Sequence, residues 1–443
     1  MVAGRRLWLP LIICVFLGGI FFWFLAGRLT YLDPKVEINP GRLYTLDFWD
    51  YPLPLVWEDG TTYLEFVQEI IADFRDKYPN VMVNYHPLSF DGGQGELTHA
   101  LQAGTPPDVY SEPFPRRIIH HQGLQIPITG YMVPEDEALY HPRVMVLMEE
   151  KEDIWAWPIW VSSEIWVGNR QILEAGGLDL DQVQTLGWNW EDFYALAGEV
   201  KQVFGDIPAF FLGPEVKSFC NLLYNNGLIG NMDRDICLNM AEETAAFFHI
   251  LYKEGLWQAS EERQSWLKEF WEGRIAIVGP VNTWVIRGSE ARIQQTRHDQ
   301  EPVFLPPPHG IGAKEYMKPT VAQVSVFRQR RYRGADKVKA AMEFARFFSH
   351  RLGHGVAPVL WALPAYDPWG QVDNEGTELS AANIRFLLRS QNYLLPPTVK
   401  QNPWECEKWQ KEVLAPRLQK LLKGEISPRE FAALIEEELK NES

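Results

Sequence analysis

The residue types that carry catalysis are present in the chain, but none of them stands in a strong catalytic motif. The patterns G-x-S-x-G, H-E-x-x-H, G-x-G-x-x-G and C-x-x-C are all absent from the sequence. Carboxylate pairs such as Asp47 with Asp50 do occur. The sequence does not place any two carboxylates at the separation that a glycosidase needs. We therefore expect a protein that is not an enzyme.

Two short motifs resemble ligand-binding sites, one for phosphate and one for a metal ion, but each is better explained without a ligand. The segment Asp91–Glu96 is rich in glycine and lacks the Lys-Ser/Thr ending of a phosphate-binding loop, so we expect a plain loop there. His120 and His121 are adjacent, and adjacent side chains on a regular element point apart. No pair of cysteines has the spacing of metal ligands. The sequence thus predicts neither a metal nor a cofactor.

Aromatic residues are the more informative group, because four tryptophans stand in the run Asp153–Asn169. In the second half of this run, large apolar and polar residues roughly alternate, which predicts a half-buried strand. Pro158 has no backbone N–H to give to a sheet, so we expect it at a strand edge or a bend. Trp166 is predicted to be a core residue. For Trp157 and Trp160, a place in the core and a place in a binding cleft are equally open.

Aromatic rings and short polar residues recur at the ends of predicted strands, and this combination is typical of a binding site. Flat rings suit the C–H faces of sugar rings or a planar cation. Asp, Glu, Ser and Asn side chains supply directional hydrogen bonds. A concave site with aromatic walls and a few polar anchors is the arrangement expected for a small-molecule ligand.

The length and the net charge of the chain limit the number of domains and the kinds of partner to be expected. A chain of 443 residues is too long for one ordinary core, so two or three domains are expected. The formal net charge of −16 argues against nucleic acid or an anionic membrane surface as a partner. Cys14, Cys220, Cys237 and Cys406 are scattered, and a Cys220–Cys237 disulfide would be allowed in an oxidising compartment.

The N-terminal segment predicts where the chain is located. Arg5 and Arg6 precede the uncharged run Leu7–Gly27. At about 1.5 Å per residue, such a helix spans a hydrocarbon core of about 30 Å. Positive residues on the first side favour an anchor with the large acidic domain outside the cytoplasm. We therefore expect a transmembrane signal anchor over residues 1–30 and a polar linker over residues 31–42.

The first part of the folded region alternates between strand and helix patterns. Leu43–Trp49 predicts a strand, and Thr62 with Glu65 forms the capping-box signature of a helix whose apolar face runs to Tyr78. Val81–Tyr85 predicts the next strand. This order implies a right-handed parallel unit in an α/β fold. A short helix over Leu97–Ala103 and a strand over 107–112 follow, and ligands in open α/β sheets bind at the carboxyl ends of such strands.

The remaining elements follow from the same patterns. Asn189 is the expected N-cap of a helix, and Ser427 with Glu430 predicts another capped helix. A buried strand over 273–278 should open into a turn at Gly279-Pro280 that presents Trp284. Pro302–Pro308 is expected to be a crossover between lobes. Further helices are expected over 241–252, 265–271 and 335–349, and further strands over 207–212 and 321–327.

Several loose motifs, taken together and in order, resemble those of bacterial extracellular solute-binding proteins of the sugar-binding type. They cover about 390 residues, from Leu43 to the C-terminus. The segments that carry the resemblance are Leu97–Val109, Pro158–Asn169 with Gly176–Leu178, Gly187–Phe193, Phe270–Trp284, Ala340–Phe344 with Leu363–Ala365, and the C-terminal helices around Gly424.

The resemblance implies a periplasmic-binding-protein-like α/β fold of type II, in which two lobes close over a ligand by hinge motion. The N-terminal lobe would comprise residues 43–157 and 307–354, and the C-terminal lobe residues 158–306 and 355–443. The implied activity is binding of a carbohydrate, such as an oligosaccharide, and its delivery to the permease subunits of an ABC importer. Carried over by position, the ligand contacts would be Trp49, Asp50, Glu112, Trp160, Ser162, Trp284 and Trp361.

Two departures from the family pattern bear on these expectations. Arg28 stands where a lipoprotein would carry its lipidated cysteine, which favours a transmembrane anchor. Pro319-Thr320 replaces the usual Gly-Gly before the strand at Val321, which leaves contacts from that loop open. Two rival functions also remain open: a ligand-sensing ectodomain of the same fold, and a polysaccharide-active enzyme.

Overall fold

The computed structural model describes residues 32–113, 123–205, 209–228, 234–259, 263–293, 301–329, 334–367, 379–396 and 407–441. The predicted anchor over residues 1–30 and the pair His120-His121 lie outside the described residues. No helix within the described ranges is long and apolar enough to cross a membrane.

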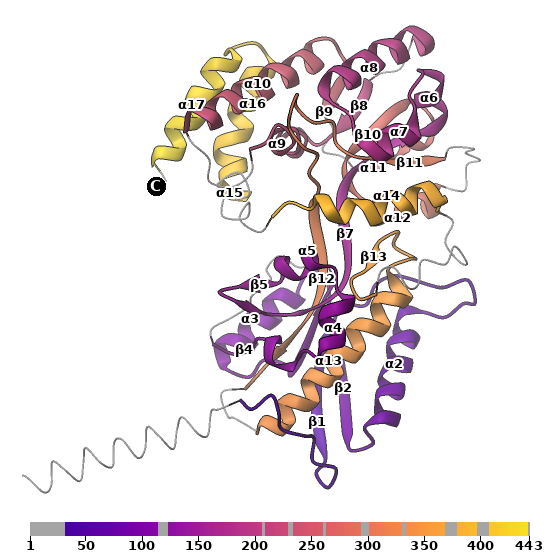
Figure 1. Ribbon diagram of the computed structural model, residues 1–443, viewed down its shortest axis with the longest axis vertical. Helices are drawn as coiled ribbons and strands as arrows, with labels where there is room; N and C mark the ends of the chain where they lie inside the picture. Colours follow the sequence, from indigo (N-terminus) through magenta and orange to yellow (C-terminus); the bar gives the residue numbers. More distant parts are fainter. Residues whose placement is uncertain are drawn as a thin grey trace, which may run out of the picture. The chain divides into compact units, whose positions relative to one another are not determined.

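The chain forms two compact units, each built from separate stretches of sequence (Figure 1). Unit 1 comprises Met1–Glu137, Met148–Ile159 and Ala322–Leu352, and unit 2 comprises Ala138–Leu147, Trp160–Val321 and Gly353–Ser443. The chain therefore passes from one unit to the other inside α4 (Pro134–Leu139), directly after α5 (Pro142–Leu147), and inside β7 (Trp157–Asn169), β12 (Lys318–Phe327) and α13 (Ala335–Val356). The predicted crossover at Pro302–Pro308 is wrong, because Pro302–Leu305 is a strand inside unit 2.

Unit 1 is an α/β layer whose sheet runs in the order β2, β1, β3, β12, with β4 paired to β12. β1 is parallel to β2 and β3, and β12 is antiparallel to β3. The remaining elements of this unit are β1 (Tyr44–Asp50), β2 (Val81–Pro87), β3 (Val109–Glu112), β4 (Gln125–Ile126), β5 (Glu149–Glu150), β6 (Asp153–Ile154), α2 (Tyr63–Lys77), α3 (Gly93–Ala103), η1 (Thr129–Tyr131) and the start of α4 (Pro134–Leu139).

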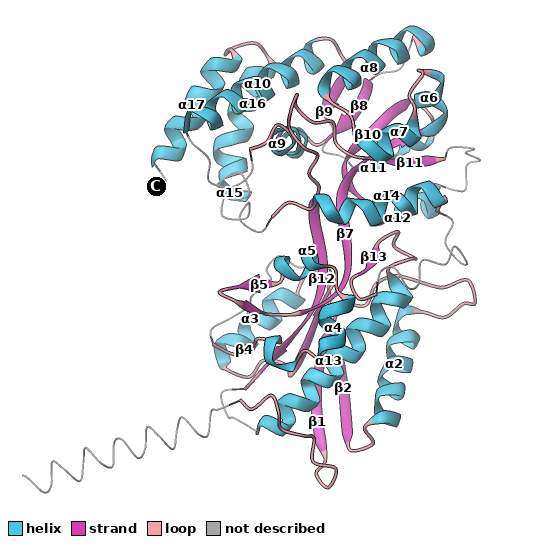
Figure 2. Ribbon diagram, viewed as in Figure 1, coloured by secondary structure: helices cyan, strands magenta, loops and turns pink. Residues whose placement is uncertain are grey.

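The core of unit 1 forms where β1 meets two helices. Alternate residues of β1 are buried, so one face of the strand packs inward. On that face, the ring of Phe48 lies 5.1 Å from that of Phe344 and 4.6 Å from that of Phe348, both on α13. Phe74 of α2 contacts Phe344 in turn, at 5.1 Å. Figure 2 shows these two helices beside β1 and β2.

Local sequence signals correctly predicted where two helices begin. Thr62 and Glu65 form the predicted capping box of α2, with the Glu65 backbone N–H donating to Thr62 Oγ1. Ser427 and Glu430 form the corresponding pair at the start of α17 (Pro428–Asn441). The loop predicted over Asp91–Glu96 is wrong in its second half, because α3 begins at Gly93 and packs Leu97 and Leu101 inward.

Asp50 is buried at the end of β1, on the same face as Phe48. Its carboxylate Oδ2 accepts hydrogen bonds from the Tyr63 hydroxyl at 3.0 Å and the Tyr85 hydroxyl at 3.3 Å. Burial disfavours the charged form and raises the pKa of Asp50 from its ordinary value of 3.8 to about 6, against the opposing effect of these hydrogen bonds.

Unit 2 is a second α/β layer, built around β7. Its sheet runs β7, β10, β8, β9, and the other edge of β7 pairs with β11 and β13. Its strands and larger helices are β8 (Ala209–Gly213), β9 (Trp257–Ala259), β10 (Ile275–Asn282), β11 (Pro302–Leu305), β13 (Leu363–Pro364), α5 (Pro142–Leu147), α6 (Arg170–Ala175), α7 (Leu180–Leu186), α8 (Trp190–Phe204), α9 (Glu215–Asn225), α10 (Arg234–Lys253), α11 (Arg263–Trp271), α12 (Thr283–Ile293) and α14 (Ala381–Ser390). The C-terminal elements are η2 (Gln391–Tyr393), α15 (Glu407–Trp409), the π-helical turn η5 (Gln410–Leu414), α16 (Ala415–Leu422) and α17.

Strand β7 is buried along its whole length, on both faces. The predicted half-buried strand is therefore wrong in its burial. Val167 pairs with Val278 of β10 on one edge and with Phe304 of β11 on the other, so neither edge of the strand is open there. Trp166 is a core residue as predicted, with its ring stacked 4.1 Å from that of Phe211 and 5.3 Å from that of Phe193 on α8. Pro158, expected at an edge or bend, lies inside the strand.

The turn predicted at Gly279-Pro280 is also wrong. Both residues lie inside β10, where the register with β7 shifts between Val278 and Val281. The strand runs on to Asn282, and α12 begins directly after it at Thr283. Trp284 is therefore the second residue of a helix and is half-buried.

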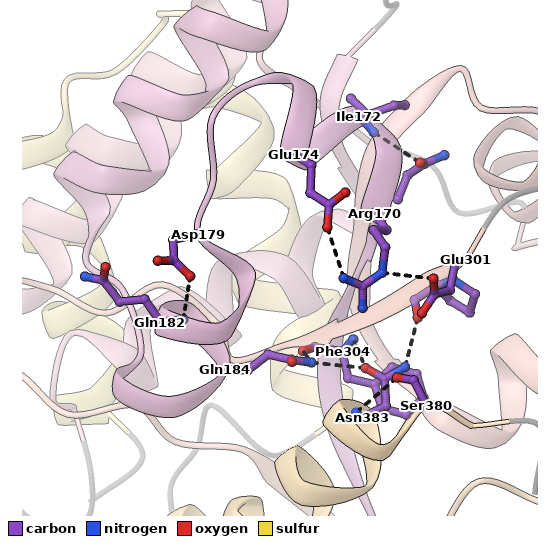
Figure 3. A network of polar contacts seen from close by, with 12 residues as sticks. Arg170, Ile172, Glu174, Asp179, Gln182, Gln184, Glu301, Phe304, Ser380 and Asn383 are labelled. Carbon is purple, nitrogen blue, oxygen red and sulfur yellow. Dashed lines mark hydrogen bonds and ion pairs between the residues drawn. The ribbon is translucent and has the colours of Figure 1, made fainter.

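A buried polar network fastens β11 to two helices (Figure 3). Asn383 of α14 accepts hydrogen bonds on Oδ1 from the Phe304 backbone N–H and from Gln184 Nε2 of α7, both at 3.0 Å. Asn383 Nδ2 donates to the Pro302 carbonyl at 2.9 Å. One amide side chain therefore satisfies an edge strand that would otherwise leave buried backbone groups without partners.

We expect Asn383→Ala to lower the free energy of unfolding by about 2–4 kcal/mol, because it leaves one buried donor and one buried acceptor of β11 unsatisfied. Chemical denaturation measures the change. Arg385→Ala, on the exposed face of the same helix, is the matched control and should stay within about 0.5 kcal/mol. Equal effects of the two substitutions would contradict the role of the network.

Asp50 should make stability depend on pH. Its folded pKa is raised, so the stability it contributes is present at low pH and is lost as the pH rises through about 6. Relative to Asp50→Asn, the unfolding free energy of the native protein should fall by about 2 kcal/mol between about pH 4.5 and about pH 7.5.

Denaturation at the two pH values checks this prediction, and Asp59→Asn is its control. The exposed Asp59 carboxylate accepts a hydrogen bond from the Thr61 backbone N–H, which lowers its pKa. Its contribution should therefore have the opposite sign, appearing as the pH rises. A difference between native protein and Asp50→Asn that is constant with pH would rule out the raised pKa.

Candidate functional site

A cavity of about 680 Å³ lies in unit 2. Its wall combines α9 along most of its length, the middle of β7, the end of β9, the start of β12 and the helices α15 and α16 with η5 between them. The volume is within the range typical of small-molecule sites, about 300–1,000 Å³. The lining residues that the structure describes all belong to unit 2.

The cavity is positioned by a matched pair of contacts between β7 and α9. Lys217 Nζ donates to Glu164 Oε1 at 2.8 Å, and Trp166 Nε1 donates to Asn221 Oδ1 at 2.9 Å. Two residues along a strand advance about 6.6 Å, and four residues along a helix advance about 6 Å. The two steps nearly coincide, so residues 164 and 166 of the strand meet residues 217 and 221 of the helix.

Glu164 carries its charge in a nearly closed environment. The residue is buried, while the Lys217 side chain keeps 40% of its surface exposed. The pair therefore reaches from the interior of the unit into the cavity. A buried carboxylate without a partner is costly, so the contact with Lys217 holds Glu164 in a fixed orientation.

Ser162 continues the same face of β7, two residues before Glu164. Its Oγ donates to Asn282 Oδ1 at 3.3 Å and lies 3.2 Å from Thr283 Oγ1. Asn282 is the register partner of Glu164 across the antiparallel pair. The predicted site residue Ser162 thus lies next to the cavity residue Glu164, and Trp284 follows two positions after Asn282.

Three predicted site residues belong to unit 1 and lie at the carboxyl ends of its parallel strands. Trp49 is half-buried with its ring 5.0 Å from that of His86. Glu112 is buried, and its Oε1 accepts a hydrogen bond from Gln94 Nε2 at 2.9 Å. Asp50 is enclosed completely, with the two tyrosine hydroxyls already bound to it.

Two predicted tryptophans of unit 2 are almost fully covered. Trp160 is 1% exposed and Trp361 is 3% exposed. Trp361 has a left-handed backbone with φ of 54°, its ring lies 5.9 Å from that of Phe304, and the Arg287 guanidinium lies over it at 5.4 Å. Trp157, for which core and cleft were both open, is fully buried.

The cavity also shows what sequence reasoning missed. Glu164, Lys217, Lys318 and Lys411 line it, and none of them was among the predicted contacts. One signal was available: Glu164 stands two residues after Ser162, so a strand places both side chains on one face. Nothing in the sequence indicated that Lys217 or Lys411 would meet that face.

Within the parts of the chain that the structure describes, no three His, Cys, Asp or Glu side chains cluster closely enough to hold a metal ion. What the cavity offers instead is a set of hydrogen-bonding groups of both charges around a defined volume. Such a set can form hydrogen bonds with a polar ligand.

Comparison with known proteins assigns the chain to a family. Residues 58–348 match the model of the bacterial extracellular solute-binding protein family. No match was found among curated protein sequences. Many solved structures share the fold.

Three of these structures illustrate the likeness. The sugar-binding protein MalE from Xanthomonas citri has a TM-score of 0.67 at 16% identity, covering 89% of this chain and 96% of MalE. The GacH receptor of Streptomyces glaucescens, solved with acarbose, has a TM-score of 0.62 at 17% identity, covering 90% and 98%. The cyclic alpha-maltosyl-1,6-maltose binding protein from Arthrobacter globiformis has a TM-score of 0.65 at 14% identity, covering 89% and 97%.

The family model spans well over half of the chain, and the α/β fold agrees with these relatives over nine tenths of its length. The family and these structural relatives are binding proteins rather than enzymes. The chain belongs to the bacterial extracellular solute-binding proteins.

Proposed function

We propose that this protein is the substrate-binding component of an ABC importer and that it captures a carbohydrate outside the cytoplasm. The cavity of unit 2 is the observation that carries the proposal. Its volume suits a small ligand, and its wall offers carboxylates and ammonium groups, which are the partners that sugar hydroxyls bind.

The choice of carbohydrate rests on the fold relatives together with this wall. Two of the three relatives are known with, or named for, an oligosaccharide or an oligosaccharide mimic. Sequence identity to them is low, so the likeness supports the ligand class and not a particular sugar. Hydroxyl groups both donate and accept, and the mixed lining of the cavity provides for both.

The predicted contacts differ in how well their burial suits direct binding. Trp284 is half-buried and directly follows Thr283, which contacts Ser162, and Trp49 is half-buried in unit 1, so both residues have exposed surface to offer a ligand. Asp50, Trp160 and Trp361 are enclosed, and we propose that they support the sites from behind.

The proposed partners follow from the family. An importer requires permease subunits in the membrane, and a solute-binding protein works on the outer side of that membrane. We propose that residues 1–30 anchor the protein there, since the uncharged run Leu7–Gly27 has the length of a transmembrane helix and Arg28 replaces a lipidated cysteine.

Carbohydrate binding is tested with the full-length chain in detergent and a panel of neutral oligosaccharides. A ligand at one hundred times its dissociation constant should stabilise the native state by about 2.7 kcal/mol and raise the melting temperature by several degrees. The sugar should be recovered unchanged. Hydrolysis of the sugar would instead favour an enzyme, and a panel without any shift would overturn the proposal.

Trp284 is predicted to stack against the sugar. Trp284→Ala should weaken binding by about 1–3 kcal/mol, or roughly one to two decades in affinity, while stability changes little. Trp188→Ala is the contrasting control, because its ring is buried and its Nε1 donates to the Pro306 carbonyl at 2.8 Å. That substitution should cost about 3–5 kcal/mol of stability.

Calorimetric titration and chemical denaturation separate the two effects. Loss of stability in Trp284→Ala with binding unchanged in the folded fraction would show that Trp284 is a core residue.

A further inference from the structure

The wall of the unit 2 cavity carries charged side chains of both signs. Among the lining residues that the structure describes, the charged ones are Lys217, Lys318, Lys411, Glu164, Glu215 and Glu407. Tyr224 is the single aromatic residue among these described lining residues. The described wall therefore offers a ligand mainly hydrogen bonds and ion–dipole contacts.

Glu164 and Lys217 stand apart from the other charged residues of the wall. Their side chains are in direct contact at 2.8 Å, and Glu164 is buried. Among the other charged lining residues that the structure describes, Glu407 and Lys411 are exposed, while Glu215 and Lys318 are half-buried. Solvent screens buried charges less than exposed ones, so the buried Glu164 and its partner contribute strongly to the local field.

We propose that Glu164 and Lys217 act as a specificity pair that makes this cavity select uncharged sugars and reject charged ones. The inference rests on the proposed function and names the ligand class of the same site. A hydroxyl group can donate to the Glu164 carboxylate and accept from the Lys217 ammonium, so a neutral polyol matches both members of the pair.

A charged sugar is disfavoured by the same geometry. The carboxylate of a uronic acid would have to compete with Glu164 for Lys217, and the ammonium of an amino sugar would have to compete with Lys217 for Glu164. Either competitor would give up its hydration. The uronate would leave the buried Glu164 carboxylate without a partner, and the ammonium would meet the positive charge of Lys217 at close range.

The specificity pair is tested with tetrasaccharides of the same length and different charge. The probes are maltotetraose, cellotetraose, xylotetraose and mannotetraose as neutral sugars, tetragalacturonate as the anionic sugar and tetraglucosamine as the cationic sugar. Full-length protein in detergent is titrated calorimetrically with each. The native protein should bind at least one neutral sugar about tenfold or more tightly than either charged sugar.

Single substitutions should shift this preference in opposite directions. Glu164→Gln leaves the charge of Lys217 unbalanced, so affinity for tetragalacturonate should rise about tenfold relative to the neutral sugar. Lys217→Met leaves Glu164 unbalanced and should favour tetraglucosamine in the same way. Lys268→Met removes one positive charge from an exposed side chain of α11, which is not among the residues that line the cavity, and should leave all affinities unchanged.

The double variant Glu164→Gln/Lys217→Met still tests the inference if a single variant does not fold. It should fold, because it buries no unpaired charge. It should lose about tenfold in affinity for the neutral sugar. Unchanged affinity in the double variant, single variants that behave like Lys268→Met, or a native protein that prefers a charged sugar would each overturn the inference. A native protein that binds none of the six sugars would overturn the proposed function, and the specificity pair with it.

Discussion

The complete burial of β7 is the constraint on which unit 2 depends. A strand covered on both faces and paired along both edges has no solvent to satisfy its polar side chains, so each of them needs a protein partner. Ser162 contacts Asn282 and Thr283, and Glu164 forms an ion pair with Lys217. The Asn169 side chain caps α6 by accepting a hydrogen bond from the Ile172 backbone N–H. These contacts hold α6, α9 and the start of α12 against β7.

The same constraint links fold and function. A polar group buried in β7 is held rigidly, because moving it would break a hydrogen bond that water cannot replace. A binding site benefits from groups that are fixed before the ligand arrives, since less freedom is lost on binding. The cavity wall combines this fixed carboxylate with the side chains of Lys217, Lys318 and Lys411, which are more exposed than Glu164.

Local signals in the sequence predicted local structure well. The capping boxes at Thr62 and Ser427 involve residues three positions apart, so the pattern contains all the information needed. The alternation in β7 was misleading, because the partners that cover its polar face lie far away in the sequence. Glu164 meets Lys217 more than fifty residues later, and Val167 pairs with strands more than a hundred residues later.

The residues of the candidate site also separate into those that a local sequence pattern predicts and those that depend on contacts distant in the sequence. Ser162 was found from the family pattern, and strand periodicity extends it to Glu164. Lys217 and Lys411 depend on how α9 and the C-terminal helices fold back onto β7, which no local pattern encodes. Ligand contact at the seven predicted positions and closure of the two units around a ligand stay predictions.

The interleaved composition of the two units sets the order in which the protein can fold during synthesis. Unit 1 needs Ala322–Leu352, which supplies the strand beside β3 and the helix that covers Phe48. At about 5–20 residues per second, that segment is made roughly ten to thirty seconds after β7. For this interval, β3 has an open edge and β1 an uncovered apolar face. A chaperone that holds the emerging chain, or a translocon that exports it unfolded, would protect these surfaces until the last strand arrives.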